Sequence, residues 1–272
     1  MLGQSSIRLT GKVTGCRGMG RDMLDHVDSE NERAAVVALL NRLLIGANQR
    51  ADTLGDWAER LLGDMASPLA QRFVNQLGDE WLDAEPPDAF CAQVAEHVRR
   101  HLASWHPGWP HLWAHILRVT GYALALADEA GERAEEAYLL SVCHDVAKLD
   151  ELRSGEPHEE LGAAFTGRIL RGYLPPARIE AIQAAILKEA DADVLGDILH
   201  DADKLDKIGA TGVLRRVSTE TRPSWLSAAL WRVGDDLARF PPMRFEFSRD
   251  MAGAKRKFLG GFLPLAEDAL EH

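Results

Sequence analysis

Four places in the sequence carry side chains of the kinds that bind metal ions. They are His115, the adjacent pair His144-Asp145, His158 and Asp203. Imidazole and carboxylate groups together suit divalent ions such as Mn, Fe, Co, Ni, Zn or Mg. A divalent-metal site is therefore the first hypothesis for the chemistry of this chain.

The adjacent pair is a weak signal by itself, because a second His-Asp pair occurs at His200-Asp201. The context of His144-Asp145 strengthens it, since the pair follows an apolar run at residues 137–143 that we expect to form a buried helical segment. A buried charge is costly unless it is paired or binds a metal. On a helix, neighbouring residues differ by about 100° in direction, so this pair can flank one ion. We interpret His200-Asp201 as a chance pair.

Two further pairs of histidines have the spacing i, i+4. His111 and His115 share the spacing of zinc metallopeptidases, but those enzymes need a glutamate after the first histidine, where this chain has Leu112. We expect His111 to line a pocket or to cap its helix. His97 and His101 adjoin arginines, which is typical of a solvated helix face.

The elements that must position these residues are helices. Apolar residues recur at helical spacing, and no alternating strand pattern of useful length occurs, so the expected fold class is all-α. The sequence predicts a poorly structured leader at residues 1–29. It predicts a helical extension at residues 30–105, which packs on the rest of the chain or on a second subunit. Residues 106–272 are expected to form the ligand-bearing domain. Helices are expected at 31–65, 69–82, 90–105, 111–129, 134–148, 157–172, 176–190, 194–207, 224–237 and 251–270.

Composition excludes several classes of protein. Hydrophobic residues make up 46% of the chain and charged residues 27%, which is typical of a globular protein and not of a disordered or fibrous one. The net charge of -11 argues against a nucleic-acid polymer as the main partner. No apolar run approaches the roughly 20 residues that span a bilayer. Three widely spaced cysteines predict no disulfide framework, so we expect a cytoplasmic protein.

From about His111 to Gly212 the chain resembles the HD-domain superfamily of metal-dependent phosphohydrolases. The motif His-x-x-Arg-Val is matched at residues 115–119, His-Asp-x-x-Lys at 144–148 and Ala-Asp-Lys-Leu at 202–205. Residues 201–210 are similar to the Asp-Ala-Asp-Lys/Arg-Leu-Asp motif of a branch of small bacterial HD proteins. The resemblance implies an HD-type helical bundle, and it does not extend to the helical extension.

The resemblance also implies one divalent ion with four protein ligands. These ligands are His115, His144, Asp145 and Asp203. Asp201 and Asp206 compete for the last position, and Asp203 is preferred because it occupies the Ala-Asp position of the family. Asp206, three residues further along the same helix, is then a supporting residue behind the ligands.

Further roles follow from the same resemblance. Lys148 is expected to offset charge on a phosphoryl group and so to serve both catalysis and substrate binding. Asp150, Glu151 and Glu156 are candidates for a general acid or base. His158 is expected to contact phosphate, to act in catalysis, or to bind a weakly held second ion.

Two other cations are candidates for the expected site, and a third marks a departure from the family pattern. Arg118 is either a substrate contact or an ion-pair partner, and Lys204 is a further candidate for substrate binding. Lys188 stands near the position where members with two metals carry a second extra histidine. A protonated lysine is no ligand, so the sequence favours one metal ion and argues against the iron oxygenases of the superfamily.

The function expected from these residues is divalent-metal-dependent hydrolysis of a phosphate ester or anhydride in a nucleotide or similar small molecule. Two alternatives stay open. One is a non-catalytic HD module that binds a nucleotide or a partner protein, and the other is an HD-type iron oxygenase. No membrane is expected as a partner, and a homodimer through the N-terminal helices is a further hypothesis.

Overall fold

The structure of the protein is a computed structural model that describes residues 34–40, 68–104, 109–188, 193–218 and 225–271. All regular elements in these residues are helices, and the one β-type pairing there is an isolated bridge between Arg171 and Leu174. The predicted all-α fold class is confirmed. The expected leader lies outside the described residues, and so does most of the helix expected at 31–65, of which residues 34–40 are described and helical.

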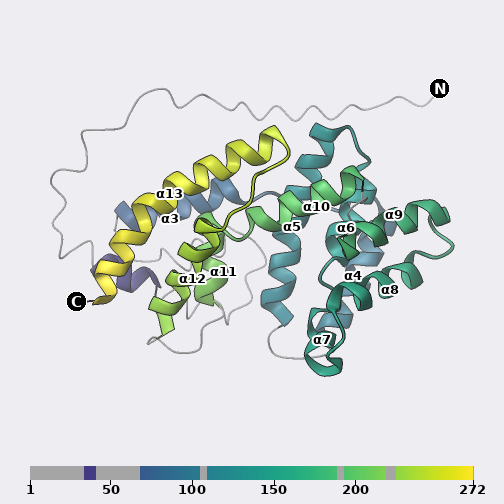
Figure 1. Ribbon diagram of the computed structural model, residues 1–272, viewed down its shortest axis with the longest axis horizontal. Coiled ribbons are helices and arrows are strands. Elements are labelled where there is room, and N and C mark those ends of the chain that lie inside the picture. The colour runs from purple at the N-terminus through teal and green to yellow at the C-terminus, as the bar shows by residue number, and fades with distance from the viewer. Residues whose placement is uncertain (1–33, 41–67, 105–108, 189–192, 219–224, 272) are drawn as a thin grey trace.

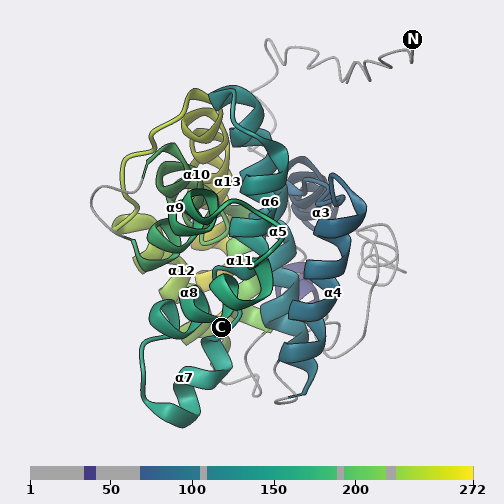
Figure 2. The same ribbon diagram turned by 90° about the vertical axis from the view of Figure 1, so that its right-hand side faces the viewer.

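The described helices keep one set of labels in Figures 1 and 2. They are α3 (Pro68–Glu80), α4 (Ala89–Ala103), α5 (Trp109–Ala130), α6 (Ala134–Cys143), α7 (Lys148–Ser154), α8 (His158–Leu170), α9 (Pro176–Leu187), α10 (Val194–Leu205), α11 (Gly209–Ser218), α12 (Leu226–Ala238) and α13 (Glu246–Glu271).

The helices form two groups that share one core (Figure 1). Helices α4 to α10 make the first group, in which α5 packs on α6 and α10, and α8 packs on α9. Helices α3, α11, α12 and α13 make the second group, and α10 joins the groups by packing on both α5 and α13. Buried residues from α3 to α13 belong to one hydrophobic cluster, so the described part of the N-terminal extension packs against the rest of the chain.

Helix α4 illustrates how the sequence produces these elements. The Asp88 side chain caps its first turn by accepting a hydrogen bond of 2.7 Å from the backbone N–H of Cys91. An N-cap carboxylate satisfies a donor that the helix itself leaves unpaired. The buried residues Cys91, Val94, Val98 and Leu102 follow at helical spacing. The helix thus packs one apolar stripe on α5 and α6.

Two local predictions were wrong. The helix predicted at 134–148 ends at Cys143, and a turn at residues 144–147 leads into the separate helix α7. The turn is closed by backbone hydrogen bonds from Val146 to Cys143 and from Lys148 to Asp145. Helix α11 was not predicted, although its buried residues Ala210, Val213, Leu214 and Val217 recur at helical spacing.

A buried polar cluster joins the extension to the remaining helices. The Glu80 carboxylate of α3 accepts hydrogen bonds from Lys255 and from the backbone N–H groups of the two residues after Gly209, at 2.8–2.9 Å. The Lys255 ammonium also donates to the hydroxyls of Tyr122 and Thr211. Glu80 and Lys255 are both fully buried, so each charge depends on the other for compensation.

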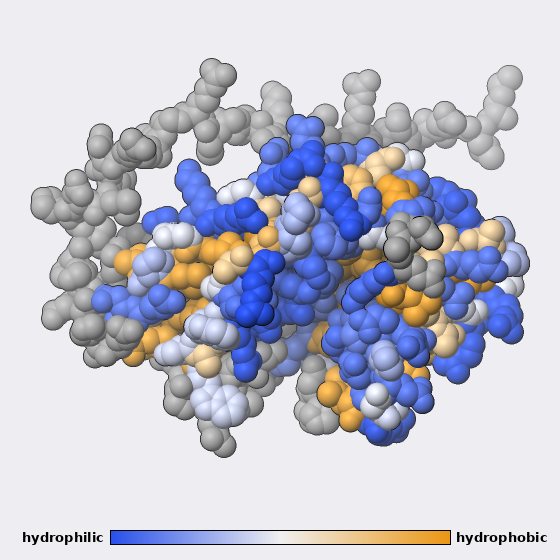
Figure 3. Space-filling model, viewed as in Figure 1, coloured by the Kyte–Doolittle hydropathy of each residue, from blue (hydrophilic) through white to orange (hydrophobic). Residues whose placement is uncertain are grey.

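On the face drawn in Figure 3, hydrophilic residues predominate and hydrophobic ones form separate patches. Among the helices that the structure describes, none combines the length and apolar character that crossing a bilayer requires.

Candidate metal centre

His115 lies on α5 with its ring almost fully buried. Its Nδ1 atom is 2.7 Å from the Asp206 carboxylate, and its Nε2 atom is buried without a hydrogen-bond partner. An ionised carboxylate only accepts, so Nδ1 carries a proton, and in the neutral ring Nε2 presents a lone pair. This arrangement of carboxylate and imidazole is the one that prepares a histidine to bind a metal.

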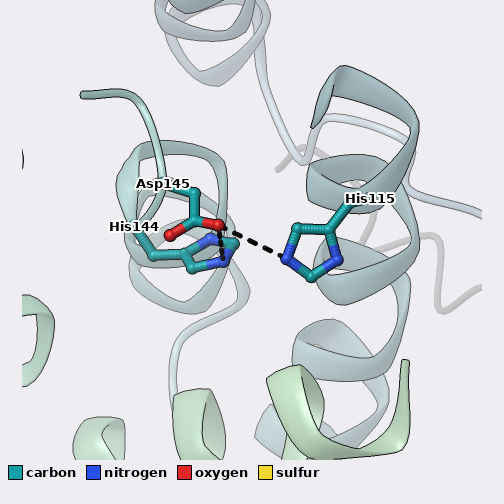
Figure 4. A group of neighbouring side chains, drawn as sticks. All are labelled: His115, His144 and Asp145. Carbon is teal, nitrogen blue, oxygen red and sulfur yellow. Dashed lines mark ion pairs between the residues drawn. The ribbon is translucent and has the colours of Figure 1, made fainter. Parts of the chain in front are cut away.

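His144 presents a second lone pair toward the same place. Its Nδ1 atom is 2.6 Å from the backbone carbonyl oxygen of Ser141, which can only accept a hydrogen bond. The proton of a neutral ring is therefore on Nδ1, and the buried Nε2 atom has no hydrogen-bond partner. His144 does not lie on a continuous helix as expected but just after α6, where the turn aims the ring at His115 (Figure 4).

Two carboxylates complete the cluster. Asp145 Oδ2 lies 3.6 Å from His115 Nε2 and 3.8 Å from His144 Nε2 (Figure 4). One ligand atom from each of these three residues falls within 4.8 Å of the others. Asp203 Oδ1, from α10, lies 3.7 Å from His115 Nε2. The structure thus brings the four residues of the expected ligand set together from three separate segments.

The charges around the cluster keep the carboxylates ionised. Burial would raise the pKa of the Asp145 carboxyl, but His144 and the other adjacent histidines lower that pKa well below its ordinary value. Burial likewise opposes the charge on Asp203, yet Lys207 and His115 lower the pKa of Asp203 below its ordinary range. Burial lowers the pKa of His144, which favours the neutral imidazole.

These residues fit a divalent metal ion. Two buried imidazole nitrogens without hydrogen-bond partners face two ionised carboxylates. Because a buried polar atom without a partner costs free energy, this arrangement calls for a bound group. A cation between His115, His144 and Asp145 would satisfy these three groups at once, and Asp203 lies beside them. The mixture of nitrogen and oxygen donors suits a borderline divalent ion such as Mn, Fe, Co, Ni or Zn.

His158 stands next to this group at the start of α8. Its Nε2 atom lies 3.3 Å from Asp145 Oδ1 and 2.9 Å from the Lys148 ammonium. Its Nδ1 atom lies 2.9 Å from Glu151 and 3.1 Å from Glu159. Because a protonated lysine only donates, Nε2 accepts from Lys148 and the ring proton sits on Nδ1, facing the two glutamates.

The group opens into a cavity of about 400 Å³. Its basic lining residues are Lys148, Lys188, Lys204, Lys207, Arg215 and Arg244, and its acidic ones are Asp145, Glu159, Asp197 and Asp203. Six cations against four carboxylates make a basic cavity, although the whole chain carries a net charge of -11. Two of the four carboxylates belong to the candidate ligand set, so a bound divalent ion would make the cavity still more positive.

The other expected site residues differ in position. Lys148, His158 and Lys204 line the cavity, whereas Arg118, Asp150 and Glu151 do not. The buried Arg118 guanidinium donates two hydrogen bonds to Asp206, so the ion-pair alternative for Arg118 matches its contacts.

Asp150 and Glu151 contact histidines instead of the cavity. Asp150 Oδ2 lies 2.8 Å from Nε2 of His101, which is one quarter exposed. The expectation that His101 belongs to a solvated face is therefore wrong, while His97 on the same helix is exposed. The third candidate acid, Glu156, is exposed as well.

The sequence analysis missed three cations of the cavity. Lys207 donates to Asp203 at 2.8 Å, and the i, i+4 spacing was the available signal. Arg215 comes from the unpredicted α11, and Arg244 from the segment before α13, where it pairs with Asp197. No spacing in the sequence connects these two arginines to the ligand residues.

The second His-Asp pair has a structural role. The buried Asp201 carboxylate accepts hydrogen bonds from the backbone N–H groups of Arg244 and Phe245 and from the hydroxyl of Ser248, at 2.5–3.1 Å. It therefore fixes the start of α13 on α10, and His200 pairs with its other oxygen at 2.9 Å. Interpreting this pair as a chance occurrence overlooked that role.

Comparison with known proteins matches the segment that carries the cluster. The HD domain family model matches residues 112–208, which contain all four candidate ligands. A predicted HD superfamily hydrolase from an uncultured Thermotogales bacterium is similar at 23% identity and a TM-score of 0.49, covering 64% of this chain and 88% of that one. Bacillus subtilis YpgQ in complex with ADP is similar at 18% identity and a TM-score of 0.49, covering 66% and 96%. No curated protein sequence matches the chain.

Proposed function

Residues 112–208 belong to the HD-domain family, and from this premise we propose that the protein is a divalent-metal-dependent phosphohydrolase. The proposed substrate is a phosphate ester or anhydride of a nucleotide or similar small molecule. Its place in a branch of small bacterial HD proteins, based on residues 201–210, stays a prediction.

One observation carries the proposal. His115 and His144 direct unpaired ring nitrogens, beside two carboxylates, toward a common point at the edge of a basic cavity. Metal ligands alone would suit many reactions, but six lysine and arginine side chains around the same cavity favour an anionic substrate. A phosphoryl group meets both conditions, because it binds divalent ions and cationic side chains together.

The expected chemistry divides between the ion and the side chains. A divalent ion bound here would polarise a phosphoryl oxygen and make a water molecule a better nucleophile. Lys148 would offset negative charge that develops on the phosphoryl oxygens. Lys204, which also lines the cavity, would bind the substrate without taking part in the reaction.

His158 is the proposed proton carrier. Its Nδ1–H faces Glu151 and Glu159, which fixes the ring so that Nε2 is directed toward Lys148 and Asp145. In this orientation Nε2 could take a proton from the attacking water and pass it to the leaving group. Glu151 then acts through His158 and not on the substrate.

Two alternative functions would give different results in the experiments below. A non-catalytic module would bind a phosphate ligand at the same cavity without turnover. An iron oxygenase would need further ligands, and Lys188, near the position expected for one of them, pairs with Glu159 at 2.6 Å. The proposed cytoplasmic location and a homodimer through the N-terminal helices stay predictions.

The first experiment is elemental analysis of protein purified without chelators or added metal. About one transition-metal ion per chain is expected, followed by phosphate release in a screen of nucleotides and sugar phosphates with added Mn²⁺. Asp145→Ala should lose both metal and activity. His200→Ala is the matched control, because His200 lines the cavity outside the ligand group. Two irons per chain would favour the oxygenase, and bound metal with no turnover would favour the binding module.

A further inference from the structure

Helix α7 carries Lys148 at its first residue and has few attachments to the rest of the molecule. The helix has seven residues, none of them is fully buried, and Leu149 is its one apolar contact with the core. A helix this short has little stability of its own in water, so tertiary contacts must fix it. In Figures 1 and 2 it lies at the edge of the molecule, beside α8. The position of the Lys148 ammonium therefore depends on the few side chains that attach α7.

Two of these attachments lead to α8. Lys148 and Glu151 both bind the His158 ring, at 2.9 Å each. Both contacts are part of the proposed reacting group and must rearrange when a substrate binds to Lys148. An anchor that keeps α7 in place during such a change has to lie outside the cavity.

The third attachment has this property and comes from the N-terminal extension. Asp150, two residues after Lys148, lies 2.8 Å from His101 Nε2, near the end of α4. The His101 ring also packs on Phe165 of α8, with a centroid distance of 4.9 Å. His101 thus contacts both α7 and α8, the helices that carry Lys148 and His158. Helix α4 lies outside residues 112–208, which match the HD domain family.

We propose that His101 is a positioning residue of the site: through Asp150 it anchors α7 and so sets the place of Lys148. The inference rests on the proposed function for the role of Lys148, but not for the anchor itself. It also gives Asp150 a different part from the general acid or base expected from the sequence, because Asp150 supports Lys148 from behind.

Three variants separate the anchor from general stability. His101→Ala removes the bond to Asp150 and the ring on Phe165. His101→Gln keeps a side-chain N–H that can donate to Asp150, and should restore the anchor. His97→Ala is the matched control on the same helix. The exposed His97 ring lies 5.7 Å from the Phe165 ring, measured between centroids, and has no bond to α7 among the described residues.

The anchor is measured without any substrate, by hydrogen–deuterium exchange of the α7 amides in full-length, Mn²⁺-loaded protein. A hydrogen bond of this kind contributes about 0.5–1.5 kcal/mol, so His101→Ala should speed exchange in residues 148–155 about threefold to tenfold. His101→Gln and His97→Ala should leave this rate near that of the wild-type protein. Unchanged exchange in His101→Ala would show that His101 is no anchor and overturn the proposal.

The effect on Lys148 is measured by titrating inorganic phosphate into the same proteins. His101→Ala should weaken phosphate binding about threefold to tenfold at unchanged Mn²⁺ content, and Lys148→Ala should weaken it at least as much. In the double variant His101→Ala/Lys148→Ala the loss should equal that of Lys148→Ala alone, since both act through one ammonium group. Additive losses, or normal phosphate binding with loosened α7, would also overturn the proposal.

The two hypotheses fail in different ways. If the wild-type protein releases no phosphate from any substrate, the proposed function fails, whereas the exchange and phosphate titrations remain readable. If it is active, kcat should fall in His101→Ala and recover in His101→Gln. Loss of activity in both variants without faster α7 exchange would contradict the anchor alone.

Discussion

One methyl group added at Gly209 should disturb the fold strongly. This glycine has a φ of +80° at the start of α11, and a Cβ atom added there would lie 2.3 Å and 2.6 Å from the two carboxylate oxygens of Glu80. Real contacts are never this short, so in Gly209→Ala the carboxylate must move. Glu80 would then lose its hydrogen bonds to the backbone of α11, and its ion pair with Lys255 would weaken.

The magnitude follows from these contacts. A non-glycine residue in the left-handed region costs about 1–2 kcal/mol. Hydrogen bonds to a charged group contribute about 1.5–3 kcal/mol each, and a buried ion pair that loses a partner costs about 3–5 kcal/mol. Since Glu80 shifts and is not removed, we expect Gly209→Ala to lower the free energy of unfolding by about 4–6 kcal/mol, a large part of the usual 5–15 kcal/mol.

Gly131→Ala is the matched control. Gly131 also has a positive φ, of +70°, but no atom lies within 4 Å of an added Cβ. This variant should lose only the backbone cost of about 1–2 kcal/mol. The assay is urea unfolding of metal-free protein, followed by circular dichroism at 222 nm. Equal losses in the two variants would refute the reasoning, because the backbone strain would then account for the whole effect and Glu80 for none of it.

Three further predictions concern the site and the cysteines. Asp206→Asn should weaken Mn²⁺ binding about 10–100-fold in a competition titration, because His115 loses the carboxylate that orients it; unchanged affinity in this variant would show that the orientation does not matter. Mn²⁺ at about 100 times its Kd should raise the free energy of unfolding of the wild-type protein by about 2.7 kcal/mol, and EDTA should reverse this gain. A similar gain in Asp145→Ala would show that the ion binds elsewhere. Burial raises the pKa of both Cys91 and Cys143 to about 12, so at pH 8 iodoacetamide should label their peptides only after unfolding in urea, as judged by mass spectrometry. A folded-state pKa above the unfolded value stabilises the fold at lower pH, so this contribution should be lost as the pH rises above about 9, and rapid labelling of native protein would contradict the buried positions.

The sequence predicted the helical class and the residues of the cluster more reliably than their local geometry. His115, His144 and Asp203 could be singled out because few residue types bind metals and because their motifs resemble those of the HD-domain superfamily. The break of the helix after Cys143 was not predicted, and at this point the His144 ring bonds to the backbone carbonyl of Ser141. Such side-chain contacts with the main chain leave no periodic signal.

Contacts between distant segments account for the remaining differences. Asp150 has the residue type and position of a general acid or base, but the structure pairs it with His101, 49 residues earlier in the chain. Arg215 contributes to the cavity from α11, a helix that was not predicted. Glu80 would be read as an ordinary surface residue, because the groups that compensate its buried charge, Lys255 and the first amides of α11, are distant in the sequence.

The burial of Glu80 bears on where this protein can be divided. A truncation that begins at residue 106 would keep every candidate ligand and all of the residues that match the HD domain family. It would also delete the only carboxylate that pairs with the Lys255 ammonium among the described residues, leaving a cation in the core and the first amides of α11 without an acceptor. The part of the chain that unfolds cooperatively should therefore begin upstream of the residues that match the HD domain family, so the two should have different N-terminal limits.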